Sequence, residues 1–264
     1  MPDAESSPEP SPNVARRIAR AIGLARSLLI YHGRPWHAAR MRALYRPFVA
    51  PGSLCFDIGA HTGSRVRCWR ALGARVLALE PQADRWHRGD PQVTVVEQAV
   101  GAEPGAARLY HSERHPTVST LDAGWVRQAA GVPSFRGVVW QPGPPVAVTT
   151  LDALIAAHGP PRFVKIDVEG LELAVLQGLS QPVPALSFEY LPALRERAAG
   201  CVQRLAQPCD YEFNHSAGES LLLAGDRWLD AAGIGEWLAG VHPSAGSGDV
   251  YARLREPVHQ QRGQ

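Results

Sequence analysis

Short apolar runs alternate with helical stretches from residue 53 onward, and this alternation restricts the fold more than any other feature of the chain. The runs are rich in Val, Leu, Ile and Phe and are bounded by Gly, Pro and acidic residues, as buried strands are. Strands that alternate with helices predict a parallel sheet with helices on both faces. Ligands of such sheets bind beyond the carboxyl ends of the strands.

The expected segments can be given by residue number. We expect strands at 53–59, 74–80, 93–100, 107–112, 146–152, 162–168 and 185–190, with a Pro/Gly-rich stretch at 131–145. We expect one helix at 64–72, which ends before Gly73, and another at 171–179. Residues 211–226 are typical of a hairpin, and 249–255 of a last strand.

The composition is that of an ordinary globular chain. Of 264 residues, 45% are hydrophobic and 20% are charged, which is enough apolar material for a sizeable core. No run of 18 apolar residues occurs, so no membrane-spanning helix is expected. The first residues lack the basic start and apolar centre of a signal peptide, and the four cysteines show no CxxC spacing. We therefore expect a cytoplasmic protein with reduced thiols.

The N-terminal part differs from the rest in charge. Residues 1–13 predict a disordered tail, and 14–50 a basic helical extension with a helix at 14–30. Between 14 and 46 there are eight arginines and no acid, whereas the remainder is slightly acidic. Either the apolar side of this helix packs on the main domain, or its arginines make a weak peripheral contact with an anionic surface. The main domain is expected at 51–256, with a tail at 257–264.

The stretch "FDIGAHTGS", residues 56–64, places Asp57 directly before a turn that contains Gly59 and Gly63. A dinucleotide site has GxGxxG and no acid before it, because a carboxylate repels a pyrophosphate. A cofactor with a positive charge, a ribose and no phosphate fits better, and S-adenosylmethionine has these properties. Glu80, at the end of the second expected strand, would accept hydrogen bonds from its ribose. Alternatively, Asp57 and Glu80 are turn and cap residues of an ordinary α/β domain.

A second acidic cluster lies in "VKIDVEG", residues 164–170. Lys165, the only lysine of the chain, alternates with Asp167 and Glu169 on one side of a strand. A buried lysine needs an anionic partner, and Asp167 is the nearest candidate. Glu189 falls at the end of the next expected strand. One interpretation is that these acids are catalytic groups that face one crevice. The alternative is that Glu169 is a first-turn acid of the following helix and Glu189 is a solvated strand end.

The ordered set of these segments resembles the FkbM family of S-adenosylmethionine-dependent methyltransferases. The motifs that carry the resemblance are "FDIGAHTGS", "ALEP", "VEQAVGAEPGAARLY", "STL", "VTTLD", "VKIDVEGLELAVLQGL" and "LSFEY", with "GDVYARL" similar to the family's closing strand. The resemblance implies the class I methyltransferase fold, a Rossmann-like three-layer α/β sandwich. Its sheet has seven mostly parallel strands with a reversed last hairpin.

On the positions that match the family's motifs, the resemblance implies that Asp57, Gly59, Gly63 and Glu80 bind the cofactor and that Asp167 and Glu169 face the transferred methyl group. The full expected cofactor-binding set is Asp57, Gly59, Ala60, His61, Gly63, Glu80, Pro81, Ala99 and Asp167, and the full expected catalytic set is Asp167, Glu169, Lys165 and Glu189. His61 stands where relatives often carry asparagine. Three further histidines, His111, His115 and His215, lie in expected loops that would close over the crevice. No metal ligands are assigned, although carboxylates sharing a crevice are also able to hold a divalent cation.

The predicted function is therefore O-methylation of a hydroxyl on a small molecule, sugar or secondary metabolite. The alternatives are a non-catalytic cofactor-binding or membrane-associated scaffold and, less well supported, an NAD-dependent dehydrogenase. We expect no nucleic-acid partner, because the main domain has no basic stripe and lacks the Asn-Pro-Pro-aromatic and Asp-Pro-Pro-aromatic motifs.

Overall fold

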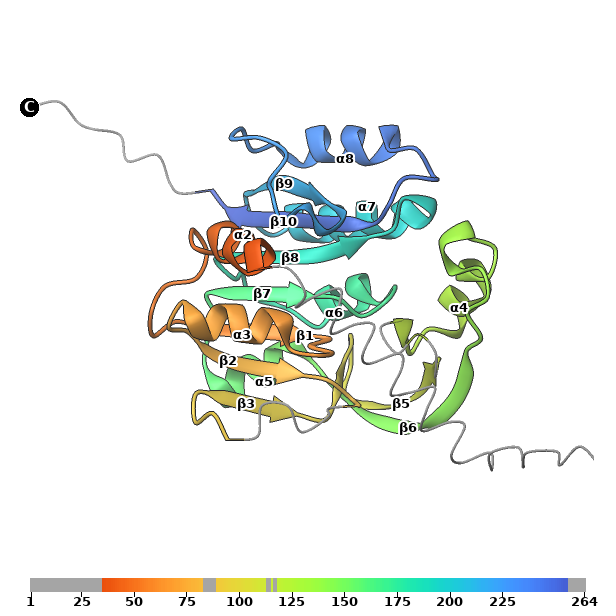
Figure 1. Ribbon diagram of the computed structural model, residues 1–264, viewed down its shortest axis with the longest axis horizontal. Helices are drawn as coiled ribbons and strands as arrows, with labels where there is room; N and C mark the ends of the chain where they lie inside the picture. Colours follow the sequence, from red (N-terminus) through yellow and green to blue (C-terminus); the bar gives the residue numbers. More distant parts are fainter. Residues whose placement is uncertain (1–34, 83–88, 113–114, 116–117, 256–264) are drawn as a thin grey trace, which may run out of the picture.

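The computed structural model describes residues 35–82, 89–112, 115 and 118–255 (Figure 1). A seven-stranded sheet forms its centre, and a three-stranded sheet lies beside it. The strands of the large sheet follow the order β3 (Val93–Val96), β2 (Arg75–Leu79), β1 (Leu54–Ile58), β7 (Phe163–Ile166), β8 (Ala185–Tyr190), β10 (Gly248–Leu254) and β9 (Tyr211–Ala217).

The large sheet is parallel except around β10. This strand pairs antiparallel with β8 and with β9, whereas the pairings among β3, β2, β1, β7 and β8 are all parallel. The predicted seven-stranded, mostly parallel sheet with a reversed last strand pair is therefore confirmed. Because β10 runs in the opposite direction, its first residues lie beside the carboxyl end of β8, and Asp249 pairs with Glu189.

Alternate side chains of the strands enter two separate cores. In β1, Phe56 and Ile58 face the core covered by α5 (Leu151–His158), α6 (Glu172–Gln177), α7 (Arg195–Ala206) and α8 (Ala231–Gly240). Cys55 faces the opposite core, which α2 (Pro35–Tyr45) and α3 (Ser64–Ala71) cover. This period of two buries both faces of the sheet and produces three layers (Figure 1).

The small sheet departs from the sequence-based expectation. The run 93–100 was expected to be one strand, but it divides into β3 and β4 (Ala99–Val100), which belong to different sheets. In the small sheet, β6 (Gln141–Thr149) lies between β4 and β5 (Gly105–His111). The first half of β6 comes from the Pro/Gly-rich stretch. It pairs there with β5 alone, and prolines are tolerated where one edge of a strand is unpaired.

The hairpin expected at 211–226 is also wrong. Residues 211–217 form β9, but the chain then enters the short 3-10 helix η4 (Gly218–Ser220), and Leu221 takes a left-handed conformation. The strand that pairs with β9 is β10, which follows only after α8. The chain that returns after η4 makes a single antiparallel bridge to β9, between Phe213 and Leu229, so the extended pairing of β9 is the long-range one with β10.

The described part of the N-terminal segment shares a core with the sheet. Five hydrophobic side chains of this segment are buried: Met41, Leu44, Tyr45, Phe48 and Val49. The Phe48 ring lies 5.2 Å from that of Phe163 in β7 and stacks on Tyr251 of β10 at 5.8 Å. The expected helix at 14–30 and both expected tails lie outside the described residues.

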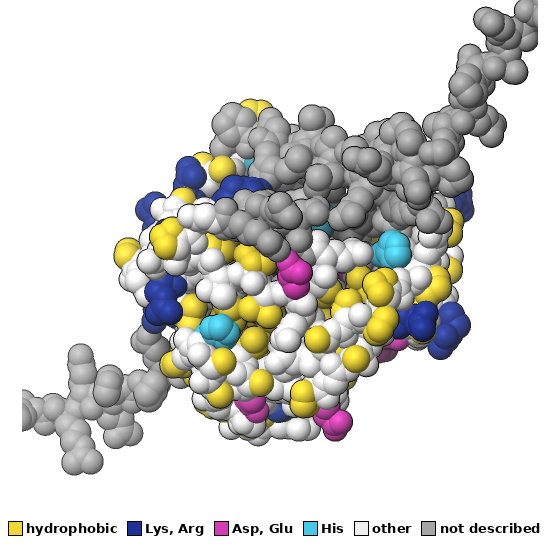
Figure 2. Space-filling model, turned by 90° about the horizontal axis from the view of Figure 1, so that it is seen from below, with side chains coloured by type: hydrophobic (Ala, Val, Ile, Leu, Met, Phe, Trp, Pro, Cys, Tyr) yellow, Lys and Arg dark blue, Asp and Glu magenta, His cyan; other side chains and the backbone are white. Residues whose placement is uncertain are grey.

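Charged side chains are sparse in the middle of one face. Figure 2 shows mostly hydrophobic and uncharged side chains there, with an acidic side chain near the centre and with Lys and Arg in separate groups toward the sides of the described surface. Among the described helices, none has the length and apolar character needed to cross a membrane.

We predict that Phe48→Ala lowers the free energy of unfolding by about 3–5 kcal/mol, because a buried aromatic ring is replaced by a cavity. Trp36→Ala is the control from the same segment. Trp36 is 60% exposed, so its removal should change stability by no more than about 0.5 kcal/mol. Chemical denaturation measures both values. Equal, small effects of the two substitutions would show that residues 36–49 do not contribute to the folded core.

Candidate active site

A cavity of about 250 Å³ lies at the carboxyl ends of β1, β2 and β7. Its lining includes almost every residue that the sequence singled out: Asp57, Gly59, Ala60, His61, Glu80, Pro81, Ala99, Lys165, Asp167, Glu169 and Glu189. Gly63 does not line it and instead precedes α3. The expectation that His111, His115 and His215 lie in loops is wrong for two of them, because His111 is the last residue of β5 (Gly105–His111) and His215 lies within β9, and none of the three is part of this lining. The cavity therefore occupies the place where a ligand of a parallel sheet is expected.

The glycine turn after β1 is shaped by a close backbone approach. A side chain at Gly59 would overlap the carbonyl oxygen of Asp167, so the loops after β1 and β7 meet only because residue 59 is glycine. Gly59 also has a φ of 83°, which glycine adopts without strain. Its backbone N–H donates to Leu79 O at 2.9 Å, which ties the turn to the end of β2.

His61 takes a left-handed conformation within the same turn, with a φ of 43°. Histidine and asparagine both visit this region more often than most residues. The His61 backbone N–H donates to Oε2 of Glu80 at 3.1 Å, and the Gln82 N–H donates to Oε1 at 2.9 Å. The Glu80 carboxylate is thus held in place between the turn and the end of β2.

Lys165 is buried in the floor of the cavity. Its Nζ donates to Oδ2 of Asp167 and to Oδ1 of Asp249, both at 3.1 Å. Burial alone would lower the pKa of Lys165, but the two carboxylates outweigh it and raise this pKa well above the ordinary value. The predicted Lys165–Asp167 ion pair is present. Asp249 was not singled out from the sequence, where it appears only as the second residue of a closing strand.

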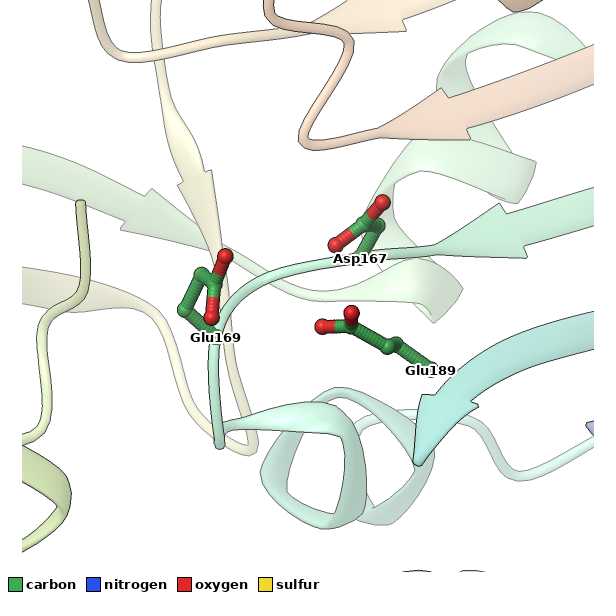
Figure 3. Close-up of side chains that lie close together, drawn as sticks. All are labelled: Asp167, Glu169 and Glu189. Atoms are coloured by element: carbon green, nitrogen blue, oxygen red, sulfur yellow. The ribbon is translucent and has the colours of Figure 1, made fainter. Parts of the chain in front are cut away.

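Three carboxylates converge beside this lysine. Asp167 follows β7, Glu169 lies in the next loop, and Glu189 extends from β8, and Figure 3 shows their side chains directed toward one another. One carboxylate oxygen from each lies within 4.8 Å of the others. The loop that carries Glu169 is held by Glu172, whose Oε1 accepts from the N–H groups of Val168 and Gly170 at 3.2 and 3.1 Å.

The three carboxyls differ in their affinity for protons. Burial and the neighbouring carboxylates raise the pKa values of Glu169 and Glu189 well above the ordinary value. Burial also opposes ionisation of Asp167, but Lys165 and Arg65 outweigh it and lower the pKa of Asp167. One carboxyl is therefore ionised while two others bind protons tightly, and this division suits proton transfer. Oxygen ligands at this spacing also match the donor set of a hard divalent cation.

Asp57 lies on the other side of Lys165 and is 2% exposed. Burial raises the pKa of its carboxyl to about 7, although Lys165 and Arg65 act in the opposite direction. Asp57 therefore changes charge close to neutral pH, unlike an exposed aspartate.

We predict that Asp57→Asn stabilises the protein above pH 7 and that this gain disappears at low pH. The carboxyl has a folded pKa of about 7 against an ordinary value of 3.8, so the folded state binds its proton more tightly. The stability that this proton provides is present below pH 4 and is lost as the pH rises to about 7. At about 1.4 kcal/mol per pKa unit, the free energy of unfolding of Asp57→Asn relative to the unmodified protein rises by at most about 4 kcal/mol between pH 4 and pH 7.

Denaturation of both proteins at pH 4, 6 and 8 measures the difference. Asp210→Asn is the control, because the Asp210 side chain is 73% exposed and its replacement should produce no such pH-dependent gain. A stability difference between Asp57→Asn and the unmodified protein that does not change with pH would contradict the raised pKa.

Comparison with known proteins identifies the family. A family model described as the methyltransferase FkbM domain matches residues 57–197, more than half of the chain. No curated protein matches the sequence.

Two solved structures illustrate the structural similarity. An O-methyltransferase from Bacillus cereus, solved in complex with SAH, is 13% identical, with coverage of 94% of this chain and 92% of that one and a TM-score of 0.41. Precorrin-6y C5,15-methyltransferase from Geobacter metallireducens is 13% identical, with coverage of 82% and 87% and a TM-score of 0.37. From the match of the family model, and in agreement with the strand order of the large sheet, the chain belongs to the FkbM family of S-adenosylmethionine-dependent methyltransferases.

Proposed function

We propose that this methyltransferase transfers a methyl group from S-adenosylmethionine to a hydroxyl oxygen of a small molecule. The observation that carries the proposal is the position of the carboxylates of Asp167, Glu169 and Glu189. They face the same cavity as the glycine turn and Glu80. A hydroxyl is a poor nucleophile at neutral pH, and a nearby proton acceptor accelerates its reaction by about 10²–10⁴-fold.

The cavity residues fit the cofactor in charge. Asp57 near the end of β1 and Glu80 directly after β2 line the cavity, so acids and not basic side chains stand at these two strand ends. We assign Glu80 to the ribose hydroxyls and Asp57 to the positively charged amino-acid part. The backbone at Ala60, His61, Pro81 and Ala99 completes the lining. When bound, S-adenosylmethionine supplies an electrophilic methyl carbon on a sulfonium centre.

The three carboxylates have different roles in activating the acceptor hydroxyl. Lys165 keeps Asp167 ionised and fixes its direction through the 3.1 Å bond to Oδ2. Glu169 and Glu189 have higher pKa values and are therefore the stronger proton acceptors once deprotonated. In this proposal the hydroxyl proton passes to one of these two glutamates, while Asp167 supplies a constant negative charge. Alignment of the reacting atoms provides a further gain, about 7–11 kcal/mol for well-oriented pairs.

The alternatives are less well supported by the site. A dehydrogenase would need a pyrophosphate beside Asp57, whose carboxylate would repel it. A scaffold without catalysis would not require three carboxylates converging on one cavity.

We propose the cytoplasm as the location of the protein, and a weak contact between its arginine-rich segment and an anionic surface. Of the described arginines in that segment, Arg40 and Arg46 are exposed.

We predict that the protein binds S-adenosylmethionine and its demethylated product but not NAD, and that Glu80→Gln weakens this binding by about 1–3 kcal/mol, or about 5–150-fold. The amide removes the charge that accepts the ribose hydroxyls. Isothermal titration calorimetry measures both. Glu103→Gln, an exposed glutamate outside the cavity lining, is the control and should bind normally. Binding of NAD by the folded protein would contradict the assignment.

We predict that Asp167→Asn lowers kcat by about 100-fold or more while cofactor affinity changes by only a few-fold. The reason is that the variant loses the fixed charge facing the acceptor. Turnover is measured as formation of the demethylated cofactor with an acceptor taken from a panel of hydroxyl compounds. Asp226→Asn, at an exposed position outside the cavity lining, is the control. A parallel loss of affinity and turnover would assign Asp167 to binding or folding.

Addition of a chelator distinguishes the two possible roles of Asp167, Glu169 and Glu189. Unchanged turnover supports proton transfer by these carboxyls, and lost turnover indicates that they hold a divalent cation.

A further inference from the structure

A second cavity, of about 220 Å³, adjoins the first. Three residues line both cavities: Glu169, Glu189 and Ser247. The two glutamates therefore stand between the space assigned to the cofactor and a separate space next to it. If the proposed function holds, a molecule in the second cavity would meet the transferred methyl group at this pair of glutamates.

Rigid aromatic side chains form one wall of the second cavity. Trp125 of α4 (Ala123–Ala129) is 2% exposed, and its ring contacts those of Phe135 at 5.2 Å and Trp140 at 5.6 Å, both edge to face. Gly170 allows Trp125 to lie against the loop after β7, because a side chain at residue 170 would overlap the indole. Leu191 and Leu194 add further apolar surface. Apart from Glu169, Glu172, Glu189 and Arg197, the side chains of this lining are thus mostly apolar.

The basic side chain in this lining is already engaged. Arg197 is the single lysine, arginine or histidine among the described residues that line the second cavity. Its NH1 donates to Oδ2 of Asp122 at 2.8 Å and to Gly170 O at 2.6 Å, and its NH2 donates to Oε1 of Gln128 at 3.1 Å. An anionic group placed here would therefore find no unengaged basic side chain among the described lining residues, at a high cost in a partly buried site.

Polar partners for a polyhydroxyl compound are also few. Apart from Arg197, Glu172 and the two shared glutamates, the polar side chains of the described lining are the hydroxyl residues Ser134, Tyr190 and Ser247. A sugar ring buried against Trp125 and Leu194 would leave several hydroxyls unpaired, each at about 1–3 kcal/mol. A second cation is disfavoured as well, because Glu169 and Glu189 bind protons tightly and a protonated carboxyl has no charge to pair with a cation.

We propose that the second cavity binds the methyl acceptor, and that this acceptor is an uncharged hydroxyl compound with a single apolar ring. A cavity of about 150 Å³ accommodates benzene, so a space of this size holds one substituted ring. The ring lies against Trp125, and the hydroxyl is directed between Glu169 and Glu189. In the transfer, the acceptor oxygen forms a bond to the methyl carbon, the carbon–sulfur bond breaks with its electron pair going to sulfur, and the hydroxyl proton goes to a glutamate.

Four matched compounds test the chemical class. The full-length protein is saturated with the demethylated cofactor, and saturation-transfer NMR and calorimetry then measure binding of 4-methylphenol, 4-hydroxybenzoate, tyramine and methyl α-glucoside. We expect 4-methylphenol to bind at least tenfold more tightly than each of the other three. Equal or tighter binding of the benzoate, the amine or the glucoside would overturn the proposed class.

A pair of tryptophan variants tests the location. Ala245 is exposed and lines the second cavity, so Ala245→Trp should fill the cavity without disturbing the core and should reduce 4-methylphenol binding at least tenfold. Ala239→Trp, at an exposed position of α8 outside both linings, should leave it unchanged. Unaltered binding of 4-methylphenol to Ala245→Trp would overturn the location.

Cofactor affinity separates this inference from the proposed function. Both tryptophan variants should bind the demethylated cofactor as the unmodified protein does, because neither residue lines the first cavity. If the unmodified protein binds the demethylated cofactor but not 4-methylphenol, the acceptor proposal is wrong and the cofactor assignment stands. If it does not bind the demethylated cofactor at all, the proposed function itself is wrong.

Discussion

The buried ammonium of Lys165 is the interaction on which the site depends. A lysine with a side chain 2% exposed is tolerated only with anionic partners, and Asp167 and Asp249 supply them at 3.1 Å each. These bonds connect the end of β7 to the start of the reversed strand β10 through the floor of the cavity. Reversal of β10 has a direct consequence for the chemistry: it brings an acid from the far end of the chain beside the carboxyl ends of the parallel strands. The single lysine of the sequence thus links the sheet topology to the ionisation of Asp167.

Negative charge accumulates around this lysine, and the structure limits its cost by two means. Asp167 remains ionised because Lys165 and Arg65 stabilise its charge, whereas burial raises the pKa values of Asp57, Glu169 and Glu189. A positively charged cofactor would lower the remaining cost further, which is why acids are tolerated here and a pyrophosphate site would not contain them. The glycine turn contributes geometry instead of charge, because Gly59 lets two loops meet and Glu80 holds the turn through the His61 N–H.

In our proposal the two cavities have separate tasks, and separate parts of the chain build them. The large sheet and its loops build the first cavity, and these loops carry most of the motifs that typify the family. The second cavity uses α4, the 3-10 helices η2 (Pro133–Phe135) and η3 (Pro192–Leu194), and the start of α7. Much of this lining therefore comes from segments where the sequence shows no recognisable motif. Variation of such peripheral segments on a constant sheet is a physical route to different acceptors with one cofactor.

The sequence by itself determined the alternation of strands and helices, the acids at the strand ends and the glycine turn, because each is a pattern between residues close in the chain. It also predicted the Lys165–Asp167 pair, two residues apart on one strand. Tertiary structure alone decided that Asp249, 84 residues from Lys165, completes that pair, and that Tyr45 and Phe48 join the core of the sheet. It also decided that residues 93–100 divide between two sheets, and that Trp125 and Arg197 meet at Gly170. Such contacts depend on how distant segments pack, and no local periodicity encodes them.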